Sequence, residues 1–119
     1  MCGIVGFINK DGVAAGITLI ERMSETLRHR GPDDGACWTR GNVALGHRRL
    51  EVIDPTPRAA QPMRSSDDRY VLNYNGEIYN YRELRVRLEN EGWVFQSDSD
   101  TEVVLAAFAV WGTDSYLEF

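Results

Sequence analysis

The sequence predicts an α+β fold built on antiparallel sheet, and two observations support this. Predicted strands and helices mix along the chain without strict alternation. Short turn signals such as Arg40-Gly41-Asn42 join several of the strands in the manner of hairpins. Together these features favour an antiparallel sheet over a doubly wound parallel one.

The chain begins with an apolar segment followed by an amphipathic one. Residues 2–9 predict a strand, because they are mainly apolar and end at a Lys-Asp-Gly turn. Residues 14–28 predict a helix that the Gly31-Pro32 pair stops. Its apolar side chains recur every three to four positions, at Ile17, Ile20, Met23 and Leu27.

Two strands, a long loop and a further strand are predicted next. The strands cover residues 36–39 and 43–53. Residues 54–69 contain three prolines and predict a loop. Loops of that length are more often functional or mobile than inert. A last strand of this group is predicted over residues 70–75.

A predicted helix follows these strands. Asn80, with Glu83 three residues later, is a variant of the capping box. Leu84 and Leu88 share one face of the helix, which we expect to be its buried face. The pattern predicts that the helix ends at Gly92.

The last predicted elements are a brief strand and an apolar helix. The strand covers residues 93–95. Ser99 and Glu102 match the capping box fully and open the helix. It continues to Trp111 and stops at Gly112.

Length and charge narrow the classes of protein. The chain has 119 residues, about one small domain, and its net charge is −5. That balance disfavours sequence-independent binding to nucleic acid or to anionic membranes. The apolar run at residues 4–8 is far too short to cross a bilayer, and no basic stretch precedes it as in a secretory signal. We therefore expect a cytoplasmic protein with no nucleic-acid and no membrane partner.

The two cysteines do not form a pattern that indicates disulfides or a metal. Cys2 and Cys37 are too few for a disulfide framework, and no Cys or His pair has a zinc-ligand spacing. Cys2 is notable for its position instead. Removal of Met1 would give it both a thiol and a free α-amine, a base suited to activating that thiol. The alternative is that Cys2 is only a small apolar residue in a strand.

Three further positions carry polar groups of interest. Asn75 and the backbone N–H of Gly76 could converge on an oxyanion, although Asn-Gly is more often a hairpin turn. Arg49 suits a carboxylate and Asp100 suits an ammonium, which together match the charged ends of a free amino acid. Arg48 and Arg49 point to opposite faces of a strand, so only one can enter a given pocket. The alternative for Asp100 is favourable charge in a first helical turn.

These residues belong to motifs that resemble the glutaminase domain of asparagine synthetases. More broadly, the chain resembles class II glutamine amidotransferases, which are N-terminal-nucleophile (Ntn) hydrolases. The resemblance covers residues 1 to about 112 and keeps six motifs in order. The motifs are MCGIVGF, RHRGPD, GHRRL with Ile53-Asp54 after it, QPM, NGEIYN and SDTE.

The resemblance implies a role for each matching position. Cys2 would attack the side-chain amide of L-glutamine and form a thioester, with its own α-amine as base and then as proton donor to ammonia. Asn75 and Gly76 would form the oxyanion hole. The remaining positions would bind the substrate: Arg49 its α-carboxylate, Asp100 with Glu77 its α-ammonium, and the backbone of Leu50, Val52 and Ile53 the pocket wall. No metal and no organic cofactor is implied for this half-reaction.

The resemblance also implies a fold and a larger protein. The family fold is an αββα sandwich of two antiparallel sheets, and residues 1–119 match only its N-terminal part. The strands that complete the second sheet and the synthetase domain, which uses ATP and Mg, are absent from this sequence. An uncovered apolar sheet face predicts that the isolated chain is unstable or self-associates as a homo-oligomer.

Three other interpretations remain open at this point. The chain could be a non-catalytic fragment or interaction module that keeps the motifs without the pocket. It could be an amidotransferase of polysaccharide biosynthesis, because relatives there use the same module with a different acceptor. It could be an N-terminal-cysteine hydrolase of another amide, which Arg49 and Asp100 disfavour. The sequence does not identify the ammonia acceptor.

Overall fold

The computed structural model describes residues 2–50 and 57–119, which form two compact units. The first, which we call unit 1, comprises residues 1–52, 60–62 and 73–75. The second, unit 2, comprises residues 53–59, 63–72 and 76–119. No helix in the described part of the chain has the length and apolarity that a membrane crossing requires.

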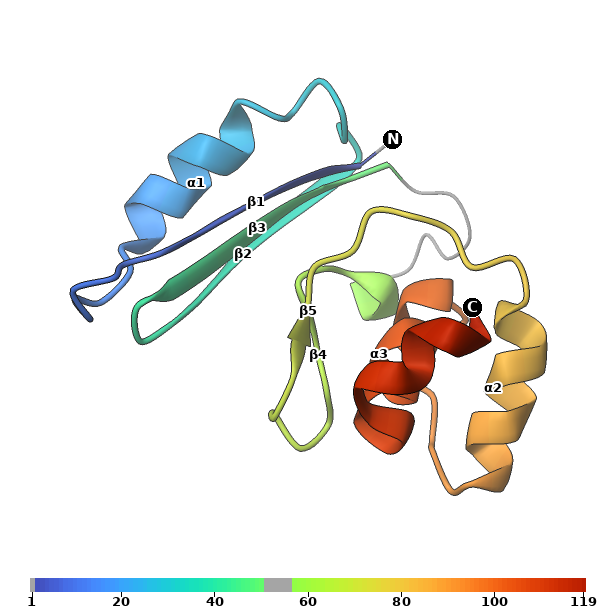
Figure 1. Ribbon diagram of the computed structural model, residues 1–119. Coiled ribbons are helices and arrows are strands. Elements are labelled where there is room, and N and C mark those ends of the chain that lie inside the picture. The colour runs from blue at the N-terminus through green and yellow to red at the C-terminus, as the bar shows by residue number, and fades with distance from the viewer. Residues whose placement is uncertain (1, 51–56) are drawn as a thin grey trace. The chain divides into compact units, whose positions relative to one another are not determined.

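Unit 1 is built on a three-stranded antiparallel sheet in the order β1-β3-β2 (Figure 1). The strands are β1 (Gly3–Ile8), β2 (Asp34–Arg40) and β3 (Val43–Arg49). Gly3 lies opposite Arg48 in the β1–β3 ladder, and Asp34 lies opposite Arg49 in the β2–β3 ladder. The sequence-based strands are thus confirmed, with β2 longer than expected and β3 ending at Arg49.

The helix α1 (Ile17–Glu25) covers one face of this sheet (Figure 1). It is shorter than the predicted range of 14–28. Ile20 and Ser24 are its buried residues, and both lie against Gly46 of β3, where even a Cβ would meet their side chains at 3.3 Å. Even-numbered β3 residues therefore face the helix, and odd-numbered residues face the opposite side. On that opposite side, Ile4 and Ile8 are 47% and 65% exposed.

Unit 2 contains a small sheet and the remaining helices. Its strands, β4 (Met63–Arg64) and β5 (Val71–Leu72), pair antiparallel. The helical elements are η1 (Pro57–Ala59), α2 (Tyr81–Asn90), α3 (Asp100–Trp111) and η2 (Gly112–Glu118). The expected 54–69 loop thus carries η1 and β4 within its described part, and the expected 70–75 strand shortens to β5.

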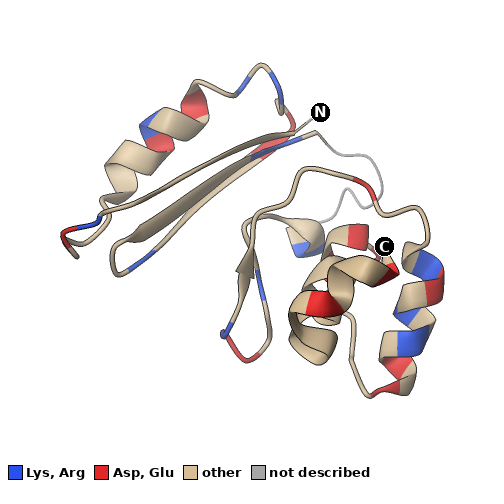
Figure 2. Cartoon of the chain, viewed as in Figure 1, with Lys and Arg blue, Asp and Glu red and all other residues tan. Residues whose placement is uncertain are grey.

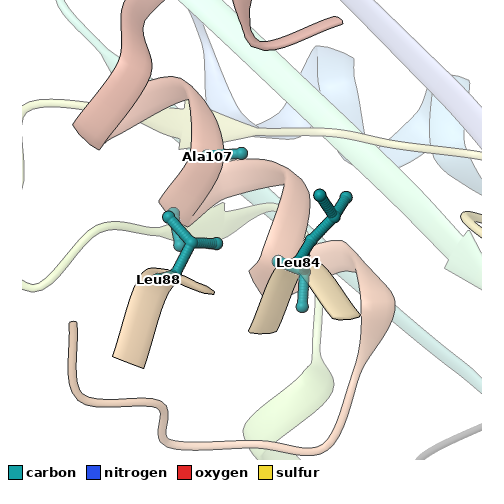
Figure 3. Close-up of a cluster of buried hydrophobic side chains, with 5 residues drawn as sticks. Leu84, Leu88 and Ala107 are labelled. Carbon is teal, nitrogen blue, oxygen red and sulfur yellow. The ribbon is translucent and has the colours of Figure 1, made fainter. Parts of the chain in front are cut away.

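The core of unit 2 lies between α2 and α3 (Figure 3). Leu84 and Leu88 face α3 from α2, which confirms the predicted buried face of that helix. The partners on α3 are Val103, Ala106 and Ala107, all fully buried. Charged residues alternate along α2, whereas α3 is largely uncharged (Figure 2). This contrast follows from burial, because α2 has an outer face in solvent and α3 is buried on most of its first three turns.

The helix boundaries confirm one predicted cap and correct another. The Ser99 side chain accepts a hydrogen bond from the Thr101 N–H at 3.1 Å, and Gly112 ends α3 with a φ of 75°. Asn80 is the N-cap of α2, but its side chain makes no capping bond, so that part of the prediction is wrong. Its amide donates to the Glu118 backbone carbonyl at 2.7 Å instead.

Two other expectations are corrected in unit 2. Residues 93–95 form no strand, because Trp93 and Phe95 pack against the helical core and the Trp93 N–H bonds to the Leu88 carbonyl at 3.0 Å. Glu102 does not return to the N-cap residue, as a full capping box requires. It accepts hydrogen bonds from the N–H groups of Gln96 and Ser97 and from the Ser97 hydroxyl. The α+β class with antiparallel sheets is confirmed and fits an Ntn-hydrolase-type domain.

Candidate functional site

Cys2 lies at the start of β1, next to the end of β3. The ladder pairs Gly3 with Arg48, so the antiparallel chains bring residue 2 beside residues 49 and 50. The Leu50 N–H donates a hydrogen bond to the Cys2 Sγ at 3.3 Å. The thiol is also 3.6 Å from the Leu50 carbonyl oxygen, to which it can donate. Cys2 is half-buried and forms no disulfide.

The backbone carbonyl of Cys2 accepts from two side chains. Asn75 donates from Nδ2 at 3.0 Å, and Arg30 donates from Nε at 3.4 Å. Asn75 is 73 residues from Cys2 in sequence. An amide nitrogen carries two hydrogens, so this bond leaves Asn75 with a second donor. The structure therefore brings together three of the predicted site residues, Cys2, Leu50 and Asn75.

Arg48 and Arg49 separate as predicted. Arg48 faces α1, where it pairs with the Glu25 carboxylate and donates to the Ser24 carbonyl. Arg49 faces the opposite side of the sheet and is only 7% exposed. Its backbone carbonyl accepts from the Asp33 N–H at 3.2 Å, which ties the RHRGPD segment to β3. Of the two arginines, Arg49 is thus the one that faces away from α1.

Three predicted site residues within the described part of the chain belong to unit 2. Asp100 is 5% exposed in the first turn of α3, and its Oδ2 accepts from the Ile78 N–H at 3.0 Å. Gly76 and Glu77 are exposed and come directly before Ile78 in the chain. Residues 75–77 form no strand, so the hairpin-turn interpretation of Asn-Gly is wrong. Val52 and Ile53 lie outside the described residues.

Sequence reasoning missed four residues that hold this region together. Arg30 binds the Cys2 carbonyl, although in the sequence it was noted only as part of the RHRGPD motif. Hydrogen bonds of Gln61, His47 and Asn73 hold residues 73–75 against the rest of unit 1. The alternation of β3 could have placed His47 on the face of Arg49. No sequence signal marked Asn73.

Burial changes the acid–base properties of two groups in unit 1. It lowers the pKa of His47, against the opposing effect of its hydrogen bond to Asn73. It also raises the pKa of Cys37, the other free cysteine. Among residues 2–50 and 57–119, no three His, Cys, Asp or Glu side chains lie together as ligands for a metal ion.

Comparison with known proteins defines the class. A family model described as a glutamine amidotransferase domain matches residues 1–119. The chain therefore belongs to the glutamine amidotransferase domain family.

The similar proteins are glutamine-hydrolysing asparagine synthetases. Asparagine synthetase 1 of Bacillus subtilis is 44% identical over 111 residues, which cover 91% of this chain and 17% of that protein. A putative asparagine synthetase of Mycobacterium tuberculosis is 42% identical over 130 residues, covering 96% and 20%. Asparagine synthetase 1 of Arabidopsis thaliana is 40% identical over 116 residues, covering 96% and 19%. The chain spans about a fifth of the length of these relatives.

Proposed function

We propose that the chain catalyses the glutaminase half-reaction, hydrolysing L-glutamine at Cys2 and releasing ammonia for amide formation. The observation that carries this proposal is the meeting of Cys2, Leu50 and Asn75, which are far apart in sequence. The Leu50 N–H orients the sulfur, and Asn75 anchors the same residue through its carbonyl. A nucleophile needs such fixed geometry to attack an amide carbon efficiently.

In the first step the Cys2 sulfur attacks the side-chain carbonyl carbon of glutamine. The α-amine of Cys2, freed by removal of Met1, takes the thiol proton. The second amide hydrogen of Asn75 and the Gly76 N–H stabilise the oxyanion that forms. The carbon–nitrogen bond then breaks, and the α-ammonium returns the proton to the departing ammonia. Water hydrolyses the resulting thioester to glutamate and restores the thiol.

We also propose which side chains would hold the charged ends of glutamine. The Arg49 guanidinium suits the α-carboxylate, and the buried Asp100 carboxylate suits the α-ammonium, with Glu77 as a second acidic group. The backbone of Val52 and Ile53 would complete the pocket. This half-reaction needs neither a metal nor an organic cofactor. The ammonia would pass to a synthetase part, as the names of the relatives suggest. The use of ATP and Mg by that part is implied only by the family resemblance.

Two cysteine variants test the proposal, because the chain contains a matched control. Cys2→Ala should abolish glutamate formation from glutamine, whereas Cys37→Ala should retain it, since Cys37 lies on β2 away from the contacts above. Intact-mass measurement should show that Met1 is absent from the active protein. Equal glutaminase activity in the wild type and Cys2→Ala would overturn the proposal, and so would full activity in protein that retains Met1.

A further inference from the structure

Residues 73–75 carry no regular secondary structure, yet each is hydrogen-bonded to another segment of unit 1. Asn73 Nδ2 donates to the Gly46 carbonyl at 2.9 Å. The Tyr74 N–H donates to Gln61 Oε1 at 2.6 Å. Asn75 Nδ2 donates to the Cys2 carbonyl. Side chains therefore replace the backbone ladder that fixes a strand, and the position of Asn75 depends on them.

The hydrogen bond from Asn73 to Gly46 determines which ring nitrogen of His47 carries the hydrogen. A backbone carbonyl only accepts, so the Asn73 amide nitrogen must face Gly46, and Asn73 Oδ1 must face the ring. Oδ1 is 2.6 Å from His47 Nδ1. Because an amide oxygen only accepts, Nδ1 carries the hydrogen and donates it. The assignment of the hydrogen to Nδ1 thus follows from the Gly46 carbonyl, which can only accept.

The second ring nitrogen, Nε2, should carry no hydrogen. His47 is 1% exposed, and its Nε2 has no hydrogen-bond partner among the residues that the structure describes. A proton there would be buried without an acceptor, which is costly. The charged groups that act on the ring are Arg49 of β3, which opposes its protonation, and Asp34 of β2, which favours it. Burial outweighs the favourable effects, so the imidazole is neutral.

We propose that His47 is a positioning residue for the glutaminase site: its neutral ring fixes the Asn73 amide, which holds the segment that ends in the oxyanion-hole residue Asn75. This inference rests on the proposed function. His47 touches no reacting atom. It acts through Asn73 and the short backbone that leads to Asn75. Its loss should therefore weaken transition-state stabilisation more than substrate binding.

Two substitutions at this position form a matched pair. Asn and Leu branch at the same atom and have similar size, but only Asn places an N–H donor near the position of His47 Nδ1. In the full protein as it is encoded, His47→Leu should lower glutaminase kcat about 10-fold or more, because small misplacements of a reacting group cost up to about 100-fold. Its KM should stay within about 2-fold. His47→Asn should recover most of the lost kcat.

The outcomes separate this inference from the proposed function. A wild-type protein without glutaminase activity overturns the proposed function and this inference with it. An active wild type with unchanged kcat in His47→Leu overturns the inference alone, as does equal loss in His47→Leu and His47→Asn.

A measurement on the wild type covers the case in which His47→Leu does not fold. Nitrogen-15 NMR of the histidine ring at neutral pH should show the Nδ1–H tautomer. The Nε2–H tautomer would overturn the inference without any variant.

Discussion

Replacing Gly31 by alanine should destabilise unit 1 through a single added carbon. Gly31 is buried beneath the backbone of β3. A Cβ there would lie 2.3 Å from the Arg48 carbonyl carbon, 2.4 Å from its oxygen and 2.5 Å from the Arg49 nitrogen. Ordinary contacts begin near 3.4 Å, so the backbones would have to separate by about 1 Å.

The strand cannot move that far without loss. β3 is the central strand and pairs with β1 and β2 on its two sides. Overpacking in a well-packed core costs about 1–3 kcal/mol, and a clash with backbone falls at the upper end, so we expect about 3 kcal/mol. With a urea dependence of about 1.5 kcal/mol per M, the unfolding midpoint should fall by about 2 M.

The assay is urea unfolding followed by far-UV circular dichroism, with Gly16→Ala as the matched control. A Cβ at Gly16 would meet nothing within 4 Å, and its φ of −77° suits alanine. The control should therefore stay within about 1 kcal/mol of the wild type. Equal midpoints for Gly31→Ala and Gly16→Ala would refute the steric reasoning.

Three further predictions concern single side chains. Leu88→Ala should cost about 3 kcal/mol because the side chain is fully buried, whereas Val86→Ala, 56% exposed on the same helix, should cost under about 0.5 kcal/mol in the same urea assay. Glu102→Gln should cost about 2 kcal/mol or more, because the carboxylate accepts from three donors and an amide would turn an N–H toward one of them; an unchanged midpoint would contradict this. His47 has a lower pKa in the folded chain than in the unfolded one, so the unfolded chain binds more protons as the pH falls below about 6.5. The free energy of unfolding should therefore decrease from pH 7.5 to about 5.5, and His47→Asn should lose that part of the decrease.

Local sequence patterns predicted those helices and strands in which a single residue fixes each end. The Ser99 hydroxyl accepts from the Thr101 N–H two residues later, and Gly112 adopts a positive φ that other residues avoid, so α3 was predicted well. Residues 93–95 have strand-forming side chains, but no strand of the described structure pairs with them. Their aromatic rings gain more by covering the α2–α3 core. Tertiary packing decided that segment, and its sequence could not show it.

The candidate site likewise contains residues that the sequence could predict and residues that it could not. Cys2 and Asn75 were found because they stand in motifs with a chemical purpose. Their supports were missed, because the bonds of His47 to Asn73 and of Tyr74 to Gln61 connect residues whose spacing follows no local rule. Such contacts depend on how a segment without secondary structure crosses a sheet face. A single sequence contains no periodicity that reports this.

The contact between Cys2 and Asn75 can form only after both residues have been synthesised. Ribosomes add about 5–20 residues per second, so the 73 residues between these positions take about 4–15 s to make. Throughout that interval the nascent chain carries its cysteine near the leading end without the partner that later anchors it. The Leu50 N–H that binds the sulfur is made earlier, whereas the hydrogen bond to the Cys2 carbonyl can form only after residue 75 has emerged. A pulse of thiol reagent on stalled chains of increasing length would separate the contributions of these two contacts to the reactivity of the thiol.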